Sequence, residues 1–188
     1  MSVLKSKTIS IAPAHISDQP VFRKRQIWPS GGRRVTRDVG PHHARMRSYS
    51  SWPIELIVHA PHDWHSKYDK TRPEIFQLQG DGKRNTAMLC YGNPKTLQTY
   101  LEEIELQRKS PPKNRRAGII RGKSISVSPA DMAVSCKCEH CRKLWNDKGG
   151  SYGTASRVMA AFVKNLAVEV KKRWPDMTVI FLPYKNYT

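Results

Sequence analysis

The chain of 188 residues is long enough for one domain with a hydrophobic core and too short for two domains of ordinary size. Its 33 Lys and Arg residues against 15 Asp and Glu residues give a formal net charge of +18, which favours an anionic partner such as nucleic acid or an acidic polysaccharide. The sequence shows no signal-peptide pattern and no apolar stretch long enough for a transmembrane segment, so by itself it predicts a cytoplasmic protein.

The first fifty residues carry much of the positive charge. They contain ten basic and two acidic residues, several prolines and a Gly-Gly pair, and they follow neither the helical nor the strand period. We therefore predict a basic, mostly irregular N-terminal segment at residues 1–50, followed by a folded domain at residues 51–188.

The folded part alternates between strand and helix patterns. Residues 52–58 are apolar and β-branched, as in a buried strand. Asn93 and Pro94 supply the N-cap and the first position of a helix whose apolar residues recur every three or four positions. The remaining predicted elements are a strand at residues 118–127, a helix at residues 158–174 and a strand at residues 177–182.

This order predicts an α/β fold with a parallel β-α-β-α-β core, because parallel strands need a crossover connection between them. In doubly wound sheets and (β/α)8 barrels, ligands bind beyond the carboxyl ends of the strands. The polar residues at those ends are the loop from His59 to His65, Asp131 and Tyr184. These residues are therefore candidates for a binding or catalytic site.

Three of the four cysteines form a C-x-C-x-x-C motif at Cys136, Cys138 and Cys141. Thiolates at this spacing can bind one zinc ion, which prefers four ligands in a tetrahedron. The fourth ligand would be Cys90 from the preceding β-α connection, because His140 is poorly placed beside Cys141. The alternative is a group of reduced structural cysteines without a metal.

Asp131 follows a predicted strand, where barrel enzymes place a general acid or a nucleophile, although an aspartate there is also a common helix cap or turn former. His59, His62 and His65 form a His-x-x-His-x-x-His loop around Trp64. These imidazoles could bind a metal, or could hydrogen-bond sugar hydroxyls beside a stacking aromatic ring. An ordinary polar loop is the third interpretation.

Several short pieces of the sequence, taken in order, resemble the family of the domain of unknown function 4838. They are residues 59–68 (HAPHDWHSKY), 72–78 (RPEIFQL), 81–84 (DGKR), 89–94 (LCYGNP), 125–131 (ISVSPAD), 136–141 (CKCEHC), 162–167 (FVKNLA), 174–176 (WPD) and 182–184 (LPY). This family is common in bacterial proteins linked to polysaccharide breakdown and is considered similar to glycoside-hydrolase (β/α)8 barrels. Its members are often exported.

The resemblance implies a carbohydrate-active, glycoside-hydrolase-like domain that acts on a polysaccharide or glycoside. It also implies part of a (β/α)8 barrel, which could be inactive by itself, since a complete barrel needs about 250 residues. Hydrolysis would use a carboxyl pair with Asp131 as one member, acting as general acid or base, and with Asp63 or Glu139 as candidates for the other. The expected substrate-binding residues are His59, His65, Trp64, Tyr184 and Arg84, the last of which could instead brace its loop.

The second hypothesis is a zinc-containing basic module that binds nucleic acid through the N-terminal segment and the loop from Arg108 to Lys123. The net positive charge of the chain supports this hypothesis. A nucleic-acid zinc knuckle would also need stacking aromatic residues among the basic ones, and only Trp145 is near the cysteines.

Overall fold

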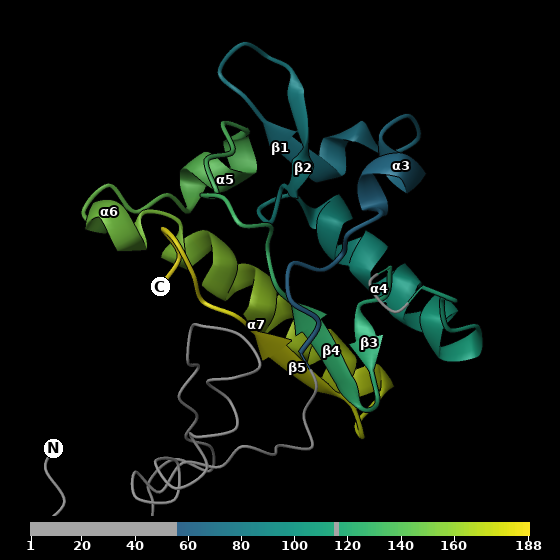
Figure 1. The fold of residues 1–188 in the computed structure, drawn as a ribbon. Helices are drawn as coiled ribbons and strands as arrows, with labels where there is room; N and C mark the ends of the chain where they lie inside the picture. Colours follow the sequence, from purple (N-terminus) through teal and green to yellow (C-terminus); the bar gives the residue numbers. More distant parts are fainter. Residues whose placement is uncertain (1–55, 115–116) are drawn as a thin grey trace, which may run out of the picture. The chain divides into compact units, whose positions relative to one another are not determined.

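The computed structural model describes residues 56–114 and 117–188 (Figure 1), and the predicted N-terminal segment 1–50 lies outside this part. The helices are α3 (Trp64–Tyr68), the 3-10 turn η1 (Pro73–Ile75), α4 (Pro94–Lys109), α5 (Glu139–Lys143), α6 (Gly150–Gly153) and α7 (Ser156–Arg173). The strands are β1 (Phe76–Leu78), β2 (Arg84–Leu89), β3 (Ile120–Arg121), β4 (Ser124–Val127) and β5 (Thr178–Phe181). None of the described helices is long and apolar enough to cross a membrane.

The described strands form two small sheets. β1 and β2 make an antiparallel hairpin, and the second sheet has the order β3-β4-β5. Within it β3 and β4 are antiparallel, whereas β4 and β5 are parallel and are connected through α5, α6 and α7. The domain is therefore mixed α/β, and the described residues form no closed barrel.

The two long helices confirm their predictions. Asn93 caps α4 by accepting a hydrogen bond from the backbone N–H of Lys95, and Pro94 occupies the first turn, where its missing N–H costs nothing. The buried face of α7 consists of Val158, Met159, Phe162, Leu166 and Val170, which recur at helical spacing. Edge-to-face packing of Phe162 on Tyr100 joins α7 to α4, with ring centroids 5.2 Å apart.

The strand predicted at residues 118–127 is confirmed only in part, because the chain reverses within it and forms two strands, β3 and β4. β3 and β4 pair through Ile120 with Ile125 and Arg121 with Ser124, which leaves Gly122 and Lys123 as a two-residue loop. Gly122 has φ +55°, a conformation that glycine adopts readily and that tight hairpin loops require. The strand predicted at residues 177–182 is confirmed as β5.

The strand predicted at residues 52–58 is wrong over its described residues, 56–58, which are not part of a sheet. The backbone N–H groups of Ile57 and His59 donate to the side-chain oxygens of Ser126 and Ser128, at 2.9 and 2.8 Å. Backbone pairing with β4 is not open to this segment, because β3 and β5 already occupy the two edges of β4. The complete parallel β-α-β-α-β core is therefore not found.

The hairpin of β1 and β2 was not predicted. Gly82 has φ +83°, and the Asp81 side chain accepts from the backbone N–H of Lys83 at 3.0 Å. The strands are short, and the pairing shifts register between Phe76 and Gln77, so no regular alternation marks them in the sequence.

Candidate functional site

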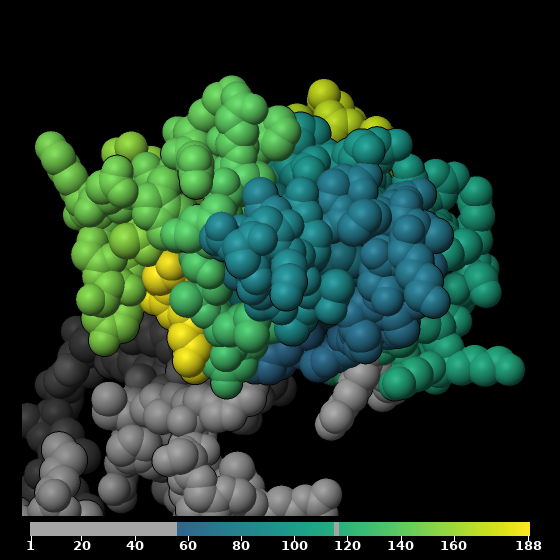
Figure 2. All heavy atoms as spheres, turned by 90° about the horizontal axis from the view of Figure 1, so that it is seen from above, coloured from purple at the N-terminus to yellow at the C-terminus, as the bar shows by residue number. Residues whose placement is uncertain are grey.

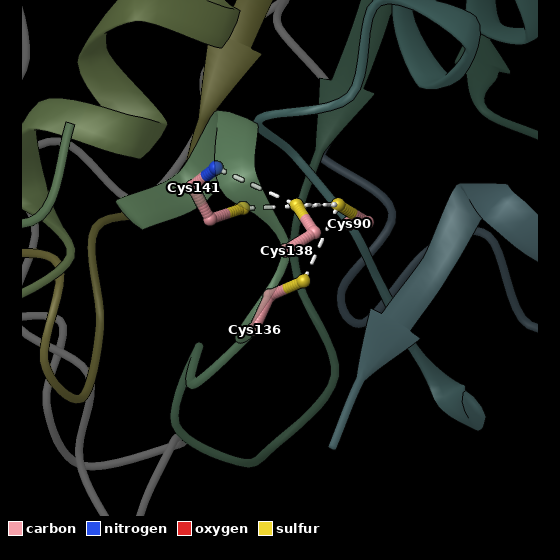
Figure 3. Close-up of side chains that lie close together, drawn as sticks. All are labelled: Cys90, Cys136, Cys138 and Cys141. Carbon is pink, nitrogen blue, oxygen red and sulfur yellow. Dashed lines mark hydrogen bonds between the residues drawn. The ribbon is translucent and has the colours of Figure 1, made fainter. Parts of the chain in front are cut away.

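The four cysteines converge from three parts of the chain (Figure 3). Cys90 follows β2, Cys136 and Cys138 lie in the loop before α5, and Cys141 lies in α5. The Cys90 sulfur is 3.4 Å from those of Cys136 and Cys138 and 3.7 Å from that of Cys141. All four sulfurs lie within 4.8 Å of one another. Four thiolates about 2.3 Å from a zinc ion would form a tetrahedron with edges of about 3.8 Å, so this arrangement fits zinc.

The surroundings of the sulfurs also suit thiolate ligands. The backbone N–H of Leu78 donates to the Cys136 sulfur at 3.2 Å, and that of Cys141 donates to the Cys138 sulfur at 3.5 Å. Hydrogen bonds from Cys141 and Cys90 lower the pKa of the Cys136 thiol, and the backbone donors act in the same direction. N–H donors of this kind orient thiolate ligands around a metal.

The β1–β2 hairpin holds the motif in place. Two hydrogen bonds of 2.9 Å join Gln77 to Ser135. The side-chain Nε2 of Gln77 donates to the Ser135 hydroxyl, and the backbone N–H of Ser135 donates to Oε1 of Gln77. The N–H of Lys137 donates to the carbonyl of Leu78 at 2.9 Å. In Figure 2 the hairpin, in teal, lies between the blue segment of α3 and the green segment of α5. The loop that carries Cys136 and Cys138 is thus attached to an element that lies far from it in sequence.

Gly92 makes room for this approach. A Cβ atom there would lie 2.7 Å from the Cys141 sulfur and 2.9 Å from the Cys141 backbone nitrogen. Both distances are shorter than a Cβ atom tolerates. Glycine is therefore needed for Cys141 to lie beside the loop that carries Cys90.

Most of the residues predicted at strand ends line a second feature, a pocket of about 280 Å³, whereas Tyr184 does not contribute to its lining. His59, His65, Trp64 and Asp131 all contribute to its lining, together with the apolar side chains of Phe76, Leu89 and Ala130. The parallel strands β4 and β5 end beside one another, with Val127 paired to Phe181. The lining of the pocket thus contains both hydrogen-bonding side chains and apolar side chains.

Asp131 is exposed at the rim of this pocket. Its Oδ1 lies 3.2 Å from Nζ of Lys185. Hydrogen bonds from Lys185 and Tyr184 lower the pKa of the Asp131 carboxyl. Tyr184 thus lies beside Asp131, as predicted for a neighbouring strand end, and Asp131 is a carboxylate at neutral pH.

Two predicted substrate-binding residues have structural contacts instead. Arg84 donates to the Phe76 carbonyl at 2.8 Å, which braces the hairpin, and Arg84 does not line the pocket. Trp64 is only 1% exposed and packs on Tyr68 and Tyr100, with centroids 5.5 and 4.8 Å away. It is a core residue that reaches the pocket, not an open stacking surface.

The histidines do not form a metal site. Each of them has one ring nitrogen within hydrogen-bond distance of a backbone carbonyl oxygen. His59 Nδ1 lies near the carbonyl oxygen of Pro129, and His62 Nε2 lies near that of Val58. His65 Nδ1 lies near the carbonyl oxygen of His62. Among the described residues, the cysteines are the only group with metal-ligand geometry. The metal-binding interpretation of the histidine loop is therefore wrong.

The second carboxylate of a hydrolytic pair is not in this pocket. Asp131 is the one carboxylate that lines it in the described part of the chain. Glu139 forms an ion pair with Lys143 at 2.6 Å, and Asp63 precedes α3 without lining the pocket. Sequence analysis also missed Lys185, since a lysine after a strand carries no signal of its own.

The cysteine cluster and the pocket both lie within the stretch that a family model matches. The model, described as Domain of unknown function (DUF4838), covers residues 1–188, and its description names no activity. Comparisons with curated proteins and with solved structures gave no match. The sequence resemblance is thus confirmed, and the chain belongs to the DUF4838 family.

Proposed function

We propose that this domain binds a carbohydrate in the pocket around Asp131. The observation that carries the proposal is the lining of the pocket, in which one carboxylate and three imidazoles surround an apolar surface. Sugars present hydroxyl groups at their edges and C–H groups on their faces, so they need both kinds of contact. The lining also includes Ala130 and Asp131, which follow the carboxyl end of β4, and the ends of parallel strands commonly support ligand sites.

The pocket supports binding more directly than it supports hydrolysis. Glycosidases use two carboxyl groups, one of which must be protonated to act as general acid. The lowered pKa of Asp131 suits a hydrogen-bond acceptor or a base and argues against the acid role. We therefore propose that glycoside hydrolysis would need a second carboxylate from outside the described pocket.

The wider architecture is part of the same proposal. β4 and β5 are parallel and are joined through α7, and one such unit is what a (β/α)8 barrel repeats. We propose that residues 51–188 correspond to a portion of such a barrel, preceded by a separate basic segment at residues 1–50.

Substitution of Asp131 by asparagine should weaken saccharide binding about tenfold or more, because a charged acceptor is lost while the shape is kept. Isothermal titration with a panel of neutral and acidic oligosaccharides measures the effect. Asp176→Asn is the matched control, since Asp176 is exposed and does not line the pocket. Equal affinity of Asp131→Asn and the unsubstituted protein, or no binding across the panel, contradicts the proposal.

We further propose that the cysteine cluster holds a structural zinc ion. Four thiolates leave no open coordination position, which distinguishes structural from catalytic zinc sites. The cluster includes Cys136, five residues after Asp131, and the intervening loop is tied at Val134 to Asn186 by hydrogen bonds of 3.0 and 2.8 Å. Zinc at this position would keep the rim of the pocket in shape.

Gly92→Ala tests the packing of this centre without removing a ligand. The added methyl group must displace Cys141, so we expect zinc affinity to fall about 10- to 100-fold, as for other changes around metal ligands. Competition with a chromogenic chelator measures it. Gly80→Ala is the control, because a Cβ at Gly80 meets no atom within 4 Å. Equal zinc affinity in the two variants would show that the approach of Gly92 to Cys141 is unimportant.

The nucleic-acid hypothesis is not favoured by the described residues. Arg108 stacks on Trp174 at 5.8 Å, and Lys109 pairs with Glu105 at 2.8 Å, so both basic side chains already have partners within the domain. The family match likewise points to no nucleic-acid-binding activity.

A further inference from the structure

Two non-glycine residues near Asp131 have a left-handed backbone: His59 lines the same pocket, and Lys185 forms an ion pair with Asp131. His59 has φ +56° and Lys185 has φ +53°. Among the described residues, all others with a positive φ are glycines. The conformation is uncommon for histidine and lysine. Residues held this way cluster at ligand sites, where the surroundings fix them.

The ring of His59 has a defined orientation. Its backbone N–H donates to the Ser128 hydroxyl at 2.8 Å, and its Nδ1 lies 2.9 Å from the Pro129 carbonyl oxygen. A carbonyl oxygen can only accept, so Nδ1 must carry the hydrogen, and in the neutral ring Nε2 then keeps a free lone pair. With a neutral ring, His59 offers Nε2 as a hydrogen-bond acceptor, and the residue contributes to the lining of the pocket.

The position of Lys185 is fixed by its neighbour. The buried side chain of Asn186 accepts from the N–H of Val134 at 3.0 Å and donates to the Val134 carbonyl at 2.8 Å. This pairing ties the chain after β5 to the loop that carries Asp131. The ammonium group of Lys185 lies 3.2 Å from the Asp131 carboxylate.

Trp64, which contributes to the lining of the pocket, carries a donor that lacks a partner. The indole N–H of Trp64 is buried and makes no hydrogen bond among the described residues. Buried N–H groups are nearly always hydrogen-bonded in folded proteins. The unpaired indole N–H is an observation independent of the rim residues.

We propose that Nε2 of His59 and the carboxylate of Asp131 bind two neighbouring hydroxyl groups of one sugar ring, with Lys185 as a positioning residue for Asp131. Vicinal hydroxyls supply the two donors that these two acceptors require. The pocket volume, about 280 Å³, is slightly below the range of about 300–1,000 Å³ for small-molecule sites, which favours a single ring over a longer chain segment. This assignment rests on the proposed carbohydrate function and specifies its recognition.

The experiment compares a bound methyl glycoside with analogues that lack one ring hydroxyl, in the unsubstituted protein and in variants at position 59. We expect the protein to prefer the complete glycoside over one deoxy analogue by about tenfold or more, since a lost partner leaves an acceptor unsatisfied. His59→Phe should reduce this preference to nearly one. His59→Gln, which places an amide oxygen near the position of Nε2, should restore part of it.

Two further measurements separate the possible outcomes. Nitrogen NMR of the histidine rings should show His59 protonated at Nδ1, with a change at Nε2 when the glycoside binds. His140→Phe makes the same substitution at an exposed position outside the pocket and should leave the preference unchanged. If the glycoside binds and Asp131→Asn weakens it, but His59→Phe keeps the full preference, the role of His59 is overturned while the carbohydrate proposal stands. If no saccharide binds, both fail.

Discussion

Cys136→Ser is expected to abolish zinc binding and to cost most of the stability of the domain. Loss of one ligand from a four-cysteine site leaves an incomplete tetrahedron, and structural zinc contributes its binding free energy directly to folding. We expect the free energy of unfolding to fall by at least about 3 kcal/mol, a large share of the 5–15 kcal/mol typical of a domain. Thermal unfolding followed by circular dichroism, with elemental analysis of the same samples, measures both quantities.

A matched variant separates loss of the metal from loss of a thiol. Cys138→His replaces one ligand by another that zinc accepts, so it should retain bound zinc and more stability than Cys138→Ser. Chelator treatment of the unsubstituted protein should reproduce the effect of Cys136→Ser. A zinc-free protein that is folded and insensitive to chelators contradicts the metal assignment and leaves the cysteines as buried packing residues.

Glu103→Ala should be the most damaging single substitution away from the cysteines. This buried carboxylate in α4 accepts hydrogen bonds from Lys67, from the Tyr68 hydroxyl and from Gln107, the last at 3.1 Å. The side-chain oxygen of Gln107, Oε1, accepts a hydrogen bond from the backbone N–H of Ile119 at 2.8 Å. Removal of the carboxylate leaves several partners unsatisfied, so we expect a loss of about 2–4 kcal/mol by urea unfolding.

The same residue predicts a dependence of stability on pH. Burial by itself raises the pKa of Glu103, but the hydrogen bonds from Lys67, Tyr68 and Gln107 outweigh it, and the pKa is lowered in the folded protein. A carboxyl group with a lowered folded pKa stabilises the protein above its unfolded pKa of about 4.5, and this contribution is lost as the pH falls through the folded value. Urea midpoints should therefore decline more steeply below about pH 4.5 in the unsubstituted protein than in Glu103→Gln. Parallel declines would show that Glu103 does not control the acid response.

The helices were predictable because local features determine them. Asn93 and Pro94 form a start signal for α4, and the apolar spacing of α7 matches its buried face residue by residue. The strands depended on tertiary contacts. A single glycine, Gly122, divides one apolar run into β3 and β4, and Ile57 bonds to a serine side chain because both edges of β4 are occupied.

The candidate sites show the same division between local and distant information. The spacing of Cys136, Cys138 and Cys141 identified three members of the cluster, and Cys90 was the only cysteine left to join them. The position of Asp131 after a strand correctly placed it near the histidine loop. The contact of Lys185 with Asp131 could not be predicted, because it depends on the pairing of Asn186 with Val134, 52 residues away in sequence.

The most direct test of the account measures saccharide affinity on protein of known zinc content. We predict that zinc-loaded protein, with about one zinc per chain, binds a saccharide, and that both zinc removal and Asp131→Asn weaken this binding, the latter without loss of zinc or of secondary structure. Zinc-loaded, folded protein that binds no saccharide, or that binds one equally well after Asp131→Asn, would contradict the claim that the pocket around Asp131 is a carbohydrate site.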